Sequence, residues 1–135
     1  MTRTVFADTS FFAAIVNERD ALHAQAKKAA AFQTDPSLTT EFVLLEVANF
    51  GTRGRQREVF ATLIANLRRS PDVEIVPASA ELFARGLDLF CQRPDKHWSL
   101  TDCISFVVMR ERGLTDALTS DHHFEQAGFT ACLQD

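Results

Sequence analysis

Short apolar runs alternate with longer amphipathic stretches along the whole chain. Runs of three or four consecutive apolar residues, too short for a helix, predict buried strands. The predicted strands are Thr4 to Ala7, a very short one ending near Leu38, Val73 to Val76, Ala117 to Thr119, and a candidate edge strand at Phe129 to Cys132.

The longer stretches carry apolar residues at helical spacing and are bounded by residues that start or stop helices. Hydroxyl and acidic residues stand where helices begin, and Gly or Pro where they end. The predicted helices are Phe11 to Val16, Asp20 to Phe32, Glu41 to Phe50, Gln56 to Arg69, Ala80 to Cys91 and Leu100 to Arg112, followed by a short helical turn from Asp121.

This alternation of strands and helices predicts an α/β layer fold with a mainly parallel sheet. Parallel sheets bind ligands beyond the carboxyl ends of their strands. Asp8 and Asp121 come after apolar strands and Asp102 opens a helix, so we expect all three to face the same edge of the sheet.

Composition narrows the class of protein. The 135 residues are 46% hydrophobic, which suits one domain, residues 1–135, with a genuine core. The net charge of −4 excludes a global basic surface for nucleic acid, so any such contact must come from local Arg or Lys groups or a bound cation.

The cysteines and the start of the chain predict a cytoplasmic location. Cys91, Cys103 and Cys132 are widely spaced among apolar neighbours, which indicates buried thiols in a reducing cytoplasm. The apolar run at the start is too short for a signal peptide, and no stretch has membrane-spanning length.

Each of the three aspartates also has an ordinary structural interpretation. Asp8 suits a strand-to-helix turn, Asp102 suits the first turn of a helix begun by Ser99, and Asp121 suits a helix N-cap. Taken singly, such roles are commoner than catalysis, so the aspartates carry weight only as a set.

Glu46 stands out because the helical spacing places it among apolar residues. Phe42, Val43, Val47 and Phe50 share its face of the predicted helix. A lone buried carboxylate costs several kcal/mol unless it is paired or bound to metal. The alternatives are a buried salt bridge or a position at the wet edge of the stripe.

Four neighbouring carboxylates would repel one another, and a hard divalent cation relieves that repulsion. An acidic set without His or Cys ligands favours Mg²⁺ or Mn²⁺ over zinc. The chemistry that uses such a site is phosphoryl transfer, because the metal lowers the pKa of a bound water and balances charge on the phosphate.

Four segments together resemble the PIN-domain family, and within it the VapC-type toxins of bacterial and archaeal toxin–antitoxin pairs. They are TVFADTSFF with Asp8, TTEFVLLEV with Glu46, SLTDCISFVVMRERG with Asp102, and ALTSDHHFEQAGF with Asp121. The resemblance covers essentially the whole chain. It implies a three-layer fold with a central sheet of four to five strands flanked by helices.

The resemblance also implies metal-dependent cleavage of RNA to a 5′-phosphate and a 3′-hydroxyl. Asp8 and Asp102 match direct metal ligands. Glu46 matches a residue that binds metal directly or through water and orients the nucleophile. Asp121 matches a ligand that acts through water or at a second metal. Ser10 and Thr119 match small hydroxyl positions that support the acids or the substrate phosphate.

Several other residues are weaker candidates for contacts with RNA. Arg53, Arg55 and His97 are candidates for holding RNA, although a solvated loop is the simpler interpretation for the arginines. Trp98 reads as a core anchor. His122 and His123 could contact a phosphate or join a metal site, but neither has a second ligand at metal spacing, so helix surface is the simpler interpretation.

The resemblance implies two protein partners, a second copy of the chain and an antitoxin that blocks the pocket. The apolar helix faces exceed what a small core needs, and part of them suits a dimer interface or a groove for an antitoxin helix. Core packing is the simpler interpretation for most of these side chains, which are Phe11, Phe12, Ile15, Phe83 and Phe90.

The sequence therefore predicts an Mg²⁺- or Mn²⁺-dependent endoribonuclease, the toxin of a toxin–antitoxin pair. The alternatives are a housekeeping PIN nuclease of RNA processing and a non-catalytic RNA- or protein-binding module. A phosphatase with an aspartyl-phosphate is disfavoured, because Ser10 stands where its second aspartate would be. Whether the target is tRNA, rRNA or mRNA stays open.

Overall fold

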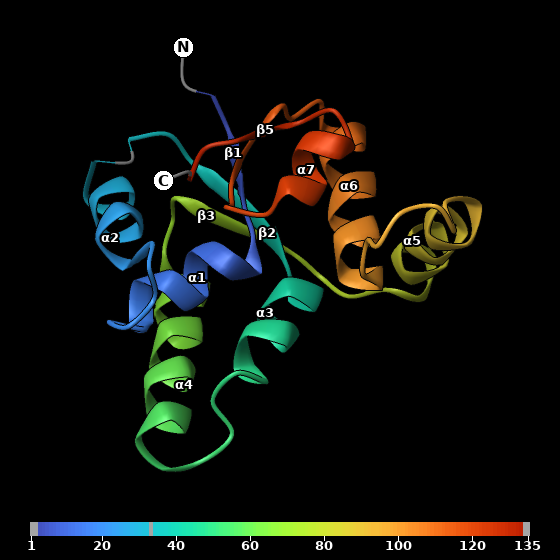
Figure 1. Ribbon diagram of the computed structural model, residues 1–135. Coiled ribbons are helices and arrows are strands. Elements are labelled where there is room, and N and C mark those ends of the chain that lie inside the picture. The colour runs from blue at the N-terminus through green and yellow to red at the C-terminus, as the bar shows by residue number, and fades with distance from the viewer. Residues whose placement is uncertain (1–2, 33, 134–135) are drawn as a thin grey trace.

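A computed structural model, which describes residues 3–32 and 34–133, places five parallel strands in one sheet (Figure 1). The strand order is β3-β2-β1-β4-β5, so β1 lies in the middle. The all-parallel pairing over the described residues confirms the predicted fold class. The strands are β1 Val5–Ala7, β2 Ser37–Thr40, β3 Val73–Val76, β4 Asp116–Leu118 and β5 Thr130–Ala131.

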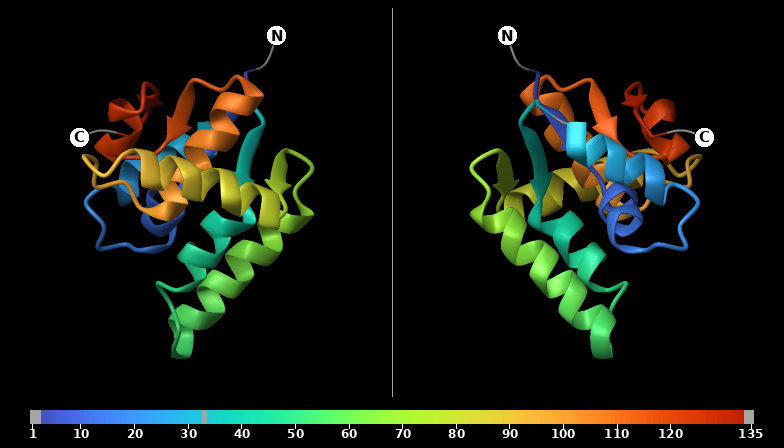
Figure 2. Two further views of the ribbon diagram at one scale, coloured as in Figure 1. Left: turned by 90° about the vertical axis from the view of Figure 1, so that its right-hand side faces the viewer. Right: turned by 90° about the vertical axis from the view of Figure 1, so that its left-hand side faces the viewer.

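Helices cover the sheet and extend beyond it. The paired helices α1 and α2 lie on one side of the sheet and α5 and α6 on the other, while α3 and α4 run together away from it (Figures 1 and 2). Within the described ranges, no helix is both long and apolar enough to cross a membrane. The helices are α1 Thr9–Val16, α2 His23–Phe32, α3 Glu41–Ala48, α4 Gly54–Arg69, α5 Ala80–Gln92, α6 Leu100–Arg112 and α7 His122–Gln126.

The predicted element bounds hold closely where capping chemistry is explicit. Helix α6 has the predicted ends, because Ser99 caps its first turn and Gly113 closes it in the left-handed conformation with φ 67°. The second helix starts at His23 rather than Asp20, because the Asp20 carboxylate accepts a hydrogen bond from Leu22 N (2.8 Å) and holds the preceding turn.

The core forms where α6 and α7 pack against the sheet. Phe106 of α6 and Phe124 of α7 are fully buried and meet edge to face, with ring centroids 4.9 Å apart. Trp98 is buried as predicted, and its indole N–H donates to the Gln126 side chain (3.0 Å). These contacts fix α7, the element that follows β4, against α6.

The exposed residues differ from expectation at two cysteines. Cys103 is buried on α6, whereas Cys91 and Cys132 are exposed, so the prediction of three buried thiols is wrong for two of them. Cys91 lies near the end of an amphipathic helix, and Cys132 follows the short edge strand β5. Apolar neighbours in sequence did not identify which face these elements expose.

Candidate active site

The carboxyl edge of the sheet gathers the candidate acids because of the order of the elements. Asp8 directly follows β1, and Asp121 follows the adjacent strand β4 by three residues. Helix α6 precedes β4, so its first turn, which contains Asp102, lies back at the carboxyl edge. Three aspartates from three elements therefore meet at one edge, as the sequence predicted.

Asp8 is a buried carboxylate that does not cap its helix. Its backbone carbonyl accepts hydrogen bonds from the first turn of α1, but its side chain makes no capping bond. Instead, its Oδ2 accepts hydrogen bonds from Thr119 Oγ1 (2.8 Å) and Ser10 Oγ (3.4 Å). The Asp8 side chain therefore does not act as a turn or capping group. The Ser10 and Thr119 hydroxyls hold it in place by hydrogen bonds.

Burial is the main influence on the pKa of the Asp8 carboxylate. The pKa of Asp8 is raised from the ordinary 3.8 to about 7, chiefly by desolvation, with a smaller rise from the Asp102 and Asp121 carboxylates and a lowering effect of the Thr119 hydrogen bond. Like charges in a dry site disfavour ionisation. Metal-free Asp8 is therefore poised to hold a proton near neutral pH.

Asp102 combines a structural role with a place in the acidic set. It forms a capping box with Ser99, whose backbone N–H donates to Asp102 Oδ2 (3.1 Å). Its pKa is raised, chiefly by burial and also by the Asp121 carboxylate. The same Asp102 side chain therefore completes the capping box and is a candidate metal ligand, so the two interpretations do not exclude each other.

Asp121 is the N-cap of α7, as its ordinary interpretation expected. Its Oδ1 accepts a hydrogen bond from His123 N (2.9 Å), and its own N–H donates to Thr119 Oγ1 (3.0 Å). Through Thr119, the backbone of Asp121 is tied to the Asp8 carboxylate. Capping therefore fixes the position of Asp121 beside the other two acids.

Glu46 lies half-buried on α3, which packs against α1 and α6, the helices that begin beside Asp8 and Asp102. Among the described residues its carboxylate has no hydrogen bond or ion pair, so the predicted alternative of a buried salt bridge does not occur. The apolar stripe is narrower than predicted: Val43 and Val47 are buried, but Phe50 is 61% exposed. Glu46 therefore lies at the edge of that stripe.

The structure corrects the interpretation of His123 as a helix-surface residue. Its Nδ1 lies 3.2 Å from Asp102 Oδ2 and 3.2 Å from Asp121 Oδ1, so the expectation that it stays outside the acidic set is wrong. The helix α7 has only five residues, and its first turn carries the imidazole back toward α6. The spacing in the sequence carries no signal for this contact, because it depends on how α7 packs against α6.

The cluster has the donor atoms of a cation site. One ligand atom each from Asp121, His122 and His123 can be chosen so that all lie within 4.8 Å of one another. His122 is exposed, and its Nδ1 lies 3.8 Å from Asp121 Oδ1. The described residues could therefore hold a metal ion at this edge.

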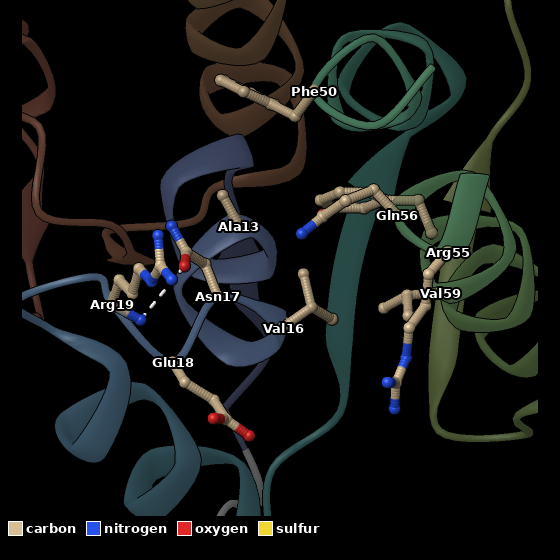
Figure 3. A pocket seen from close by; sticks show the side chains of 10 residues that line it. Ala13, Val16, Asn17, Glu18, Arg19, Phe50, Arg55, Gln56 and Val59 are labelled. Carbon is tan, nitrogen blue, oxygen red and sulfur yellow. Dashed lines mark hydrogen bonds between the residues drawn. The ribbon is translucent and has the colours of Figure 1, made fainter. Parts of the chain in front are cut away.

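A groove of about 900 Å³ lies between the end of α1 and the α3–α4 hairpin (Figure 3). Val16 and Val59 contribute apolar surface, Phe50 faces the groove from the end of α3, and Arg19 and Arg55 lie on its two sides (Figure 3). The groove is therefore lined by both apolar and polar side chains, with arginines on opposite sides and Glu18 beside Arg19.

The other predicted RNA-binding residues lie outside this groove. Arg53 is exposed at the N-cap of α4, and His97 is exposed in the loop before α6. No described contact joins either residue to the three aspartates.

The comparisons with known proteins agree with this architecture. Residues 5–130 match the PIN domain family. The chain is 33% identical over 125 residues to the 23S rRNA-specific endonuclease VapC20 of Mycobacterium tuberculosis, covering 93% of this chain and 95% of that protein. The chain belongs to the PIN-domain family. The predicted resemblance, including its VapC-type branch, is confirmed.

Three solved structures have the same fold. The crystal structure of VapC20, described as a sarcin-ricin loop cleaving toxin, has a TM-score of 0.84 and 31% identity, covering 93% of this chain and 96% of that chain. VapBC2 of Rickettsia felis, bound to a DNA fragment from its promoter, has a TM-score of 0.65 at 11% identity, covering 95% and 96%. FitAcB of Neisseria gonorrhoeae has a TM-score of 0.61 at 15% identity, covering 94% of each chain. At these low identities the last two show the fold alone.

The buried Asp8 carboxylate predicts that the metal-free protein loses stability as pH rises. Because folding raises the pKa of Asp8 from 3.8 to about 7, the folded state binds a proton more tightly, and the free energy of unfolding falls between about pH 4 and pH 7. Replacing Asp8 by Asn should remove up to about 4 kcal/mol of this fall. Urea unfolding in EDTA at pH 4.5 and pH 8 measures it.

The matched control is Asp72→Asn, an exposed carboxylate before β3. Its profile should follow the wild type. An Asp8→Asn profile that falls as steeply as the wild type would show that Asp8 is already ionised at little cost.

Proposed function

We propose that this PIN-domain protein is a divalent-metal-dependent endoribonuclease and the toxin of a toxin–antitoxin pair. The observation that carries the proposal is the convergence of Asp8, Asp102 and Asp121 at the carboxyl edge of the sheet. There the Asp102 and Asp121 carboxylates raise the pKa of Asp8, and the Asp121 carboxylate also raises the pKa of Asp102. The predicted enzyme class, a nuclease acting on phosphodiester bonds, is confirmed by the family and by the endonuclease VapC20.

The donor set fits Mg²⁺ or Mn²⁺. Three carboxylates from separate elements crowd one site and repel one another, and the Glu46 carboxylate nearby has no described partner. We assign Asp8 and Asp102 as direct ligands, with Glu46 and Asp121 binding directly or through water. When bound, the cation supplies a Lewis acid that lowers the pKa of water and balances charge on the scissile phosphate.

Other side chains of the protein position the Asp8 carboxylate and the attacking water. The Ser10 and Thr119 hydroxyls hold the Asp8 carboxylate in place. Glu46, without a competing partner, orients the attacking water. The water oxygen attacks phosphorus, the bond from phosphorus to the 3′-oxygen breaks, and the leaving oxygen takes a proton. The products are a 5′-phosphate and a 3′-hydroxyl.

The RNA strand is proposed to cross the groove between α1 and the α3–α4 hairpin. Phe50 lies one helical turn beyond Glu46 and offers an exposed aromatic face on which a base can stack. Arg55 on α4 neutralises a phosphate in the groove, and the exposed Arg53 at the start of α4 neutralises one beyond its edge. His97, exposed in the loop before α6, remains a candidate contact for RNA. This supports RNA binding by a protein whose net charge is −4.

Two protein partners complete the proposal. VapC20 is named a toxin, and such a toxin in the cytoplasm needs an antitoxin that covers the acidic edge. The second partner is another copy of the chain. Phe11 and Phe12 are buried, so they cannot form that interface, but Phe83, Leu87 and Phe90 form an exposed stripe along α5. We assign the dimer interface to this stripe.

Metal-dependent cleavage is the first test. Purified protein should cut a labelled RNA pool with Mg²⁺ or Mn²⁺ and stop with EDTA. Asp8→Asn and Asp102→Asn should each reduce the rate by at least about 100-fold, because each removes a charge that holds the cation. Cleavage that survives either variant would show that the acidic edge is not the active site. If the wild-type protein binds RNA but does not cut it, the result would favour a non-catalytic binding module.

The groove is tested with two arginines of the same helix. Arg55→Gln should raise KM several-fold with little change in kcat, and should lower the salt slope of RNA binding by about 0.7–1 because one phosphate contact is lost. Arg68→Gln, an exposed arginine in the last turn of α4, should leave both quantities unchanged. Equal effects of the two variants would mean that charge acts at long range, without a site in the groove.

The dimer is tested by sedimentation equilibrium. Wild type should sediment as a dimer, and the double substitution Phe83→Ser with Leu87→Ser should weaken association at least about tenfold, because it removes apolar area from the stripe. The control Ala84→Ser changes an exposed residue of the same helix. A monomeric wild type, or a dimer that resists the double substitution, would contradict this interface.

A further inference from the structure

The imidazole of His123 joins helix α7 to helix α6, which lies beside it (Figure 1). Its Nδ1 is hydrogen-bonded to Asp102 Oδ2 on α6 at 3.2 Å, and Asp121 Oδ1, at the N-cap of α7, lies at the same distance of 3.2 Å. The side chain is 20% exposed, so the ring is largely withdrawn from water. One side chain therefore contacts two of the three aspartates.

The position of the imidazole is set by the packing of α7. Phe124, the residue after His123, is fully buried against Phe106 of α6. At the end of the helix, the Gln126 side chain accepts a hydrogen bond from the Trp98 indole (3.0 Å), just before α6. These contacts hold α7 on α6, so the ring meets the first turn of α6 at a fixed place.

Both oxygens near Nδ1 belong to carboxylates. An ionised carboxylate only accepts hydrogen bonds, so the contact requires a hydrogen on Nδ1. In a neutral ring this fixes the tautomer and leaves Nε2 as the acceptor nitrogen. Burial and the Asp121 carboxylate raise the pKa of Asp102, and the hydrogen bond from His123 lowers it. The ring therefore eases the repulsion between the two acids.

The donors of the protein gather on one oxygen of each of these two carboxylates. Asp102 Oδ2 accepts hydrogen bonds from the Ser99 backbone N–H (3.1 Å) and from the imidazole. Asp121 Oδ1 accepts one from the His123 backbone N–H (2.9 Å) and also faces the imidazole. Within the described part of the chain, Asp102 Oδ1 and Asp121 Oδ2 accept no hydrogen bond. One oxygen of each acid is therefore anchored, and the other is available to a cation.

We propose that His123 is a positioning residue of the metal site, whose Nδ1–H holds the Asp102 carboxylate to α7 and sets its distance from Asp121. The inference rests on the proposed function, since it concerns the ligands of that site. The capping box with Ser99 holds Asp102 only within its own helix, whereas the imidazole ties it to the next one. Because Nδ1 carries a hydrogen, it does not bind the cation, and it acts on the cation only through the two carboxylates.

The first test locates the proton on His123 by nuclear magnetic resonance. In the metal-free, ¹⁵N-labelled wild type at pH 8, long-range correlation of ring nitrogens and hydrogens should show a protonated Nδ1. The His123→Asn spectrum assigns this signal among the four histidines. Mg²⁺, which is diamagnetic, should leave Nδ1 protonated, because the ring positions the ligands and is not one of them. An Nδ1 that carries no proton, or that loses it when Mg²⁺ binds, would overturn the proposal.

The affinity for Mn²⁺, measured by calorimetry, tests whether this hydrogen bond positions the acids. His123→Ala removes the donor and should weaken Mn²⁺ binding about tenfold or more. His123→Asn places an amide N–H close to the position of Nδ1–H and should recover most of the affinity. His123→Gln carries the same amide one methylene further, near the position of Nε2, and should not recover it. The glutamine variant is therefore the matched control for the polarity of the new side chain.

The indole N–H of Trp98 shows whether α7 stays in place in these variants. It donates to Gln126 at the end of α7, and Trp98 is the single tryptophan of the chain, so its signal in the same spectra is unambiguous. The signal should be unchanged in all three variants. If it shifts in His123→Ala, the affinities of the asparagine and glutamine variants decide the proposal.

The outcomes separate this inference from the proposed function. Unchanged Mn²⁺ affinity in His123→Ala, or recovery by glutamine instead of asparagine, overturns the role of His123 and leaves the nuclease intact. A wild type that binds neither Mn²⁺ nor Mg²⁺ and cuts no RNA overturns both. A protonated Nδ1, with affinity lost in the alanine and glutamine variants and recovered in the asparagine variant, is the result expected.

Discussion

The mutual repulsion of three aspartates at one edge of the sheet is the constraint around which this structure is built. Asp8 is buried enough that its pKa rises to about 7, and the Asp102 and Asp121 carboxylates contribute to that rise. Burial and the Asp121 carboxylate raise the pKa of Asp102. The fold does not remove the repulsion. It surrounds the carboxylates with hydroxyls, backbone N–H groups and one imidazole, which partly satisfy them and leave room for a cation.

The parallel sheet makes this convergence a consequence of topology. Because β1 and β4 are neighbours, the residues that follow them are brought together, and the helix before β4 begins at the same edge. The aromatic packing of Phe106 against Phe124 then sets α7 against α6. A fault in that packing would displace Asp121 and His123 together, although neither belongs to the core.

The acidic edge and the arginines lie on different elements, which reconciles a net charge of −4 with an RNA substrate. In the proposed function, a bound cation would supply positive charge where the phosphate is cut, and the arginines of the α3–α4 hairpin would supply it along the strand. Because the cation and the arginines share the task of neutralising phosphates, the basic surface can be confined to the α3–α4 hairpin. The chain needs no global positive charge, which would attract every nucleic acid in the cell equally.

The sequence by itself determined the α/β class, most element bounds and the three aspartates, because strands, caps and glycine stops are local signals. The four motif segments also identified the family. The sequence could not decide which face each element buries. Cys91, Cys132 and Phe50 are exposed although their neighbours are apolar, and Glu46 lies at an edge rather than within its stripe. Only the tertiary structure placed His123 between Asp102 and Asp121, because that contact depends on how α7 packs on α6 across 21 residues of chain. Local spacing fixes what a residue can reach within its own helix, and packing alone decides what it meets on another.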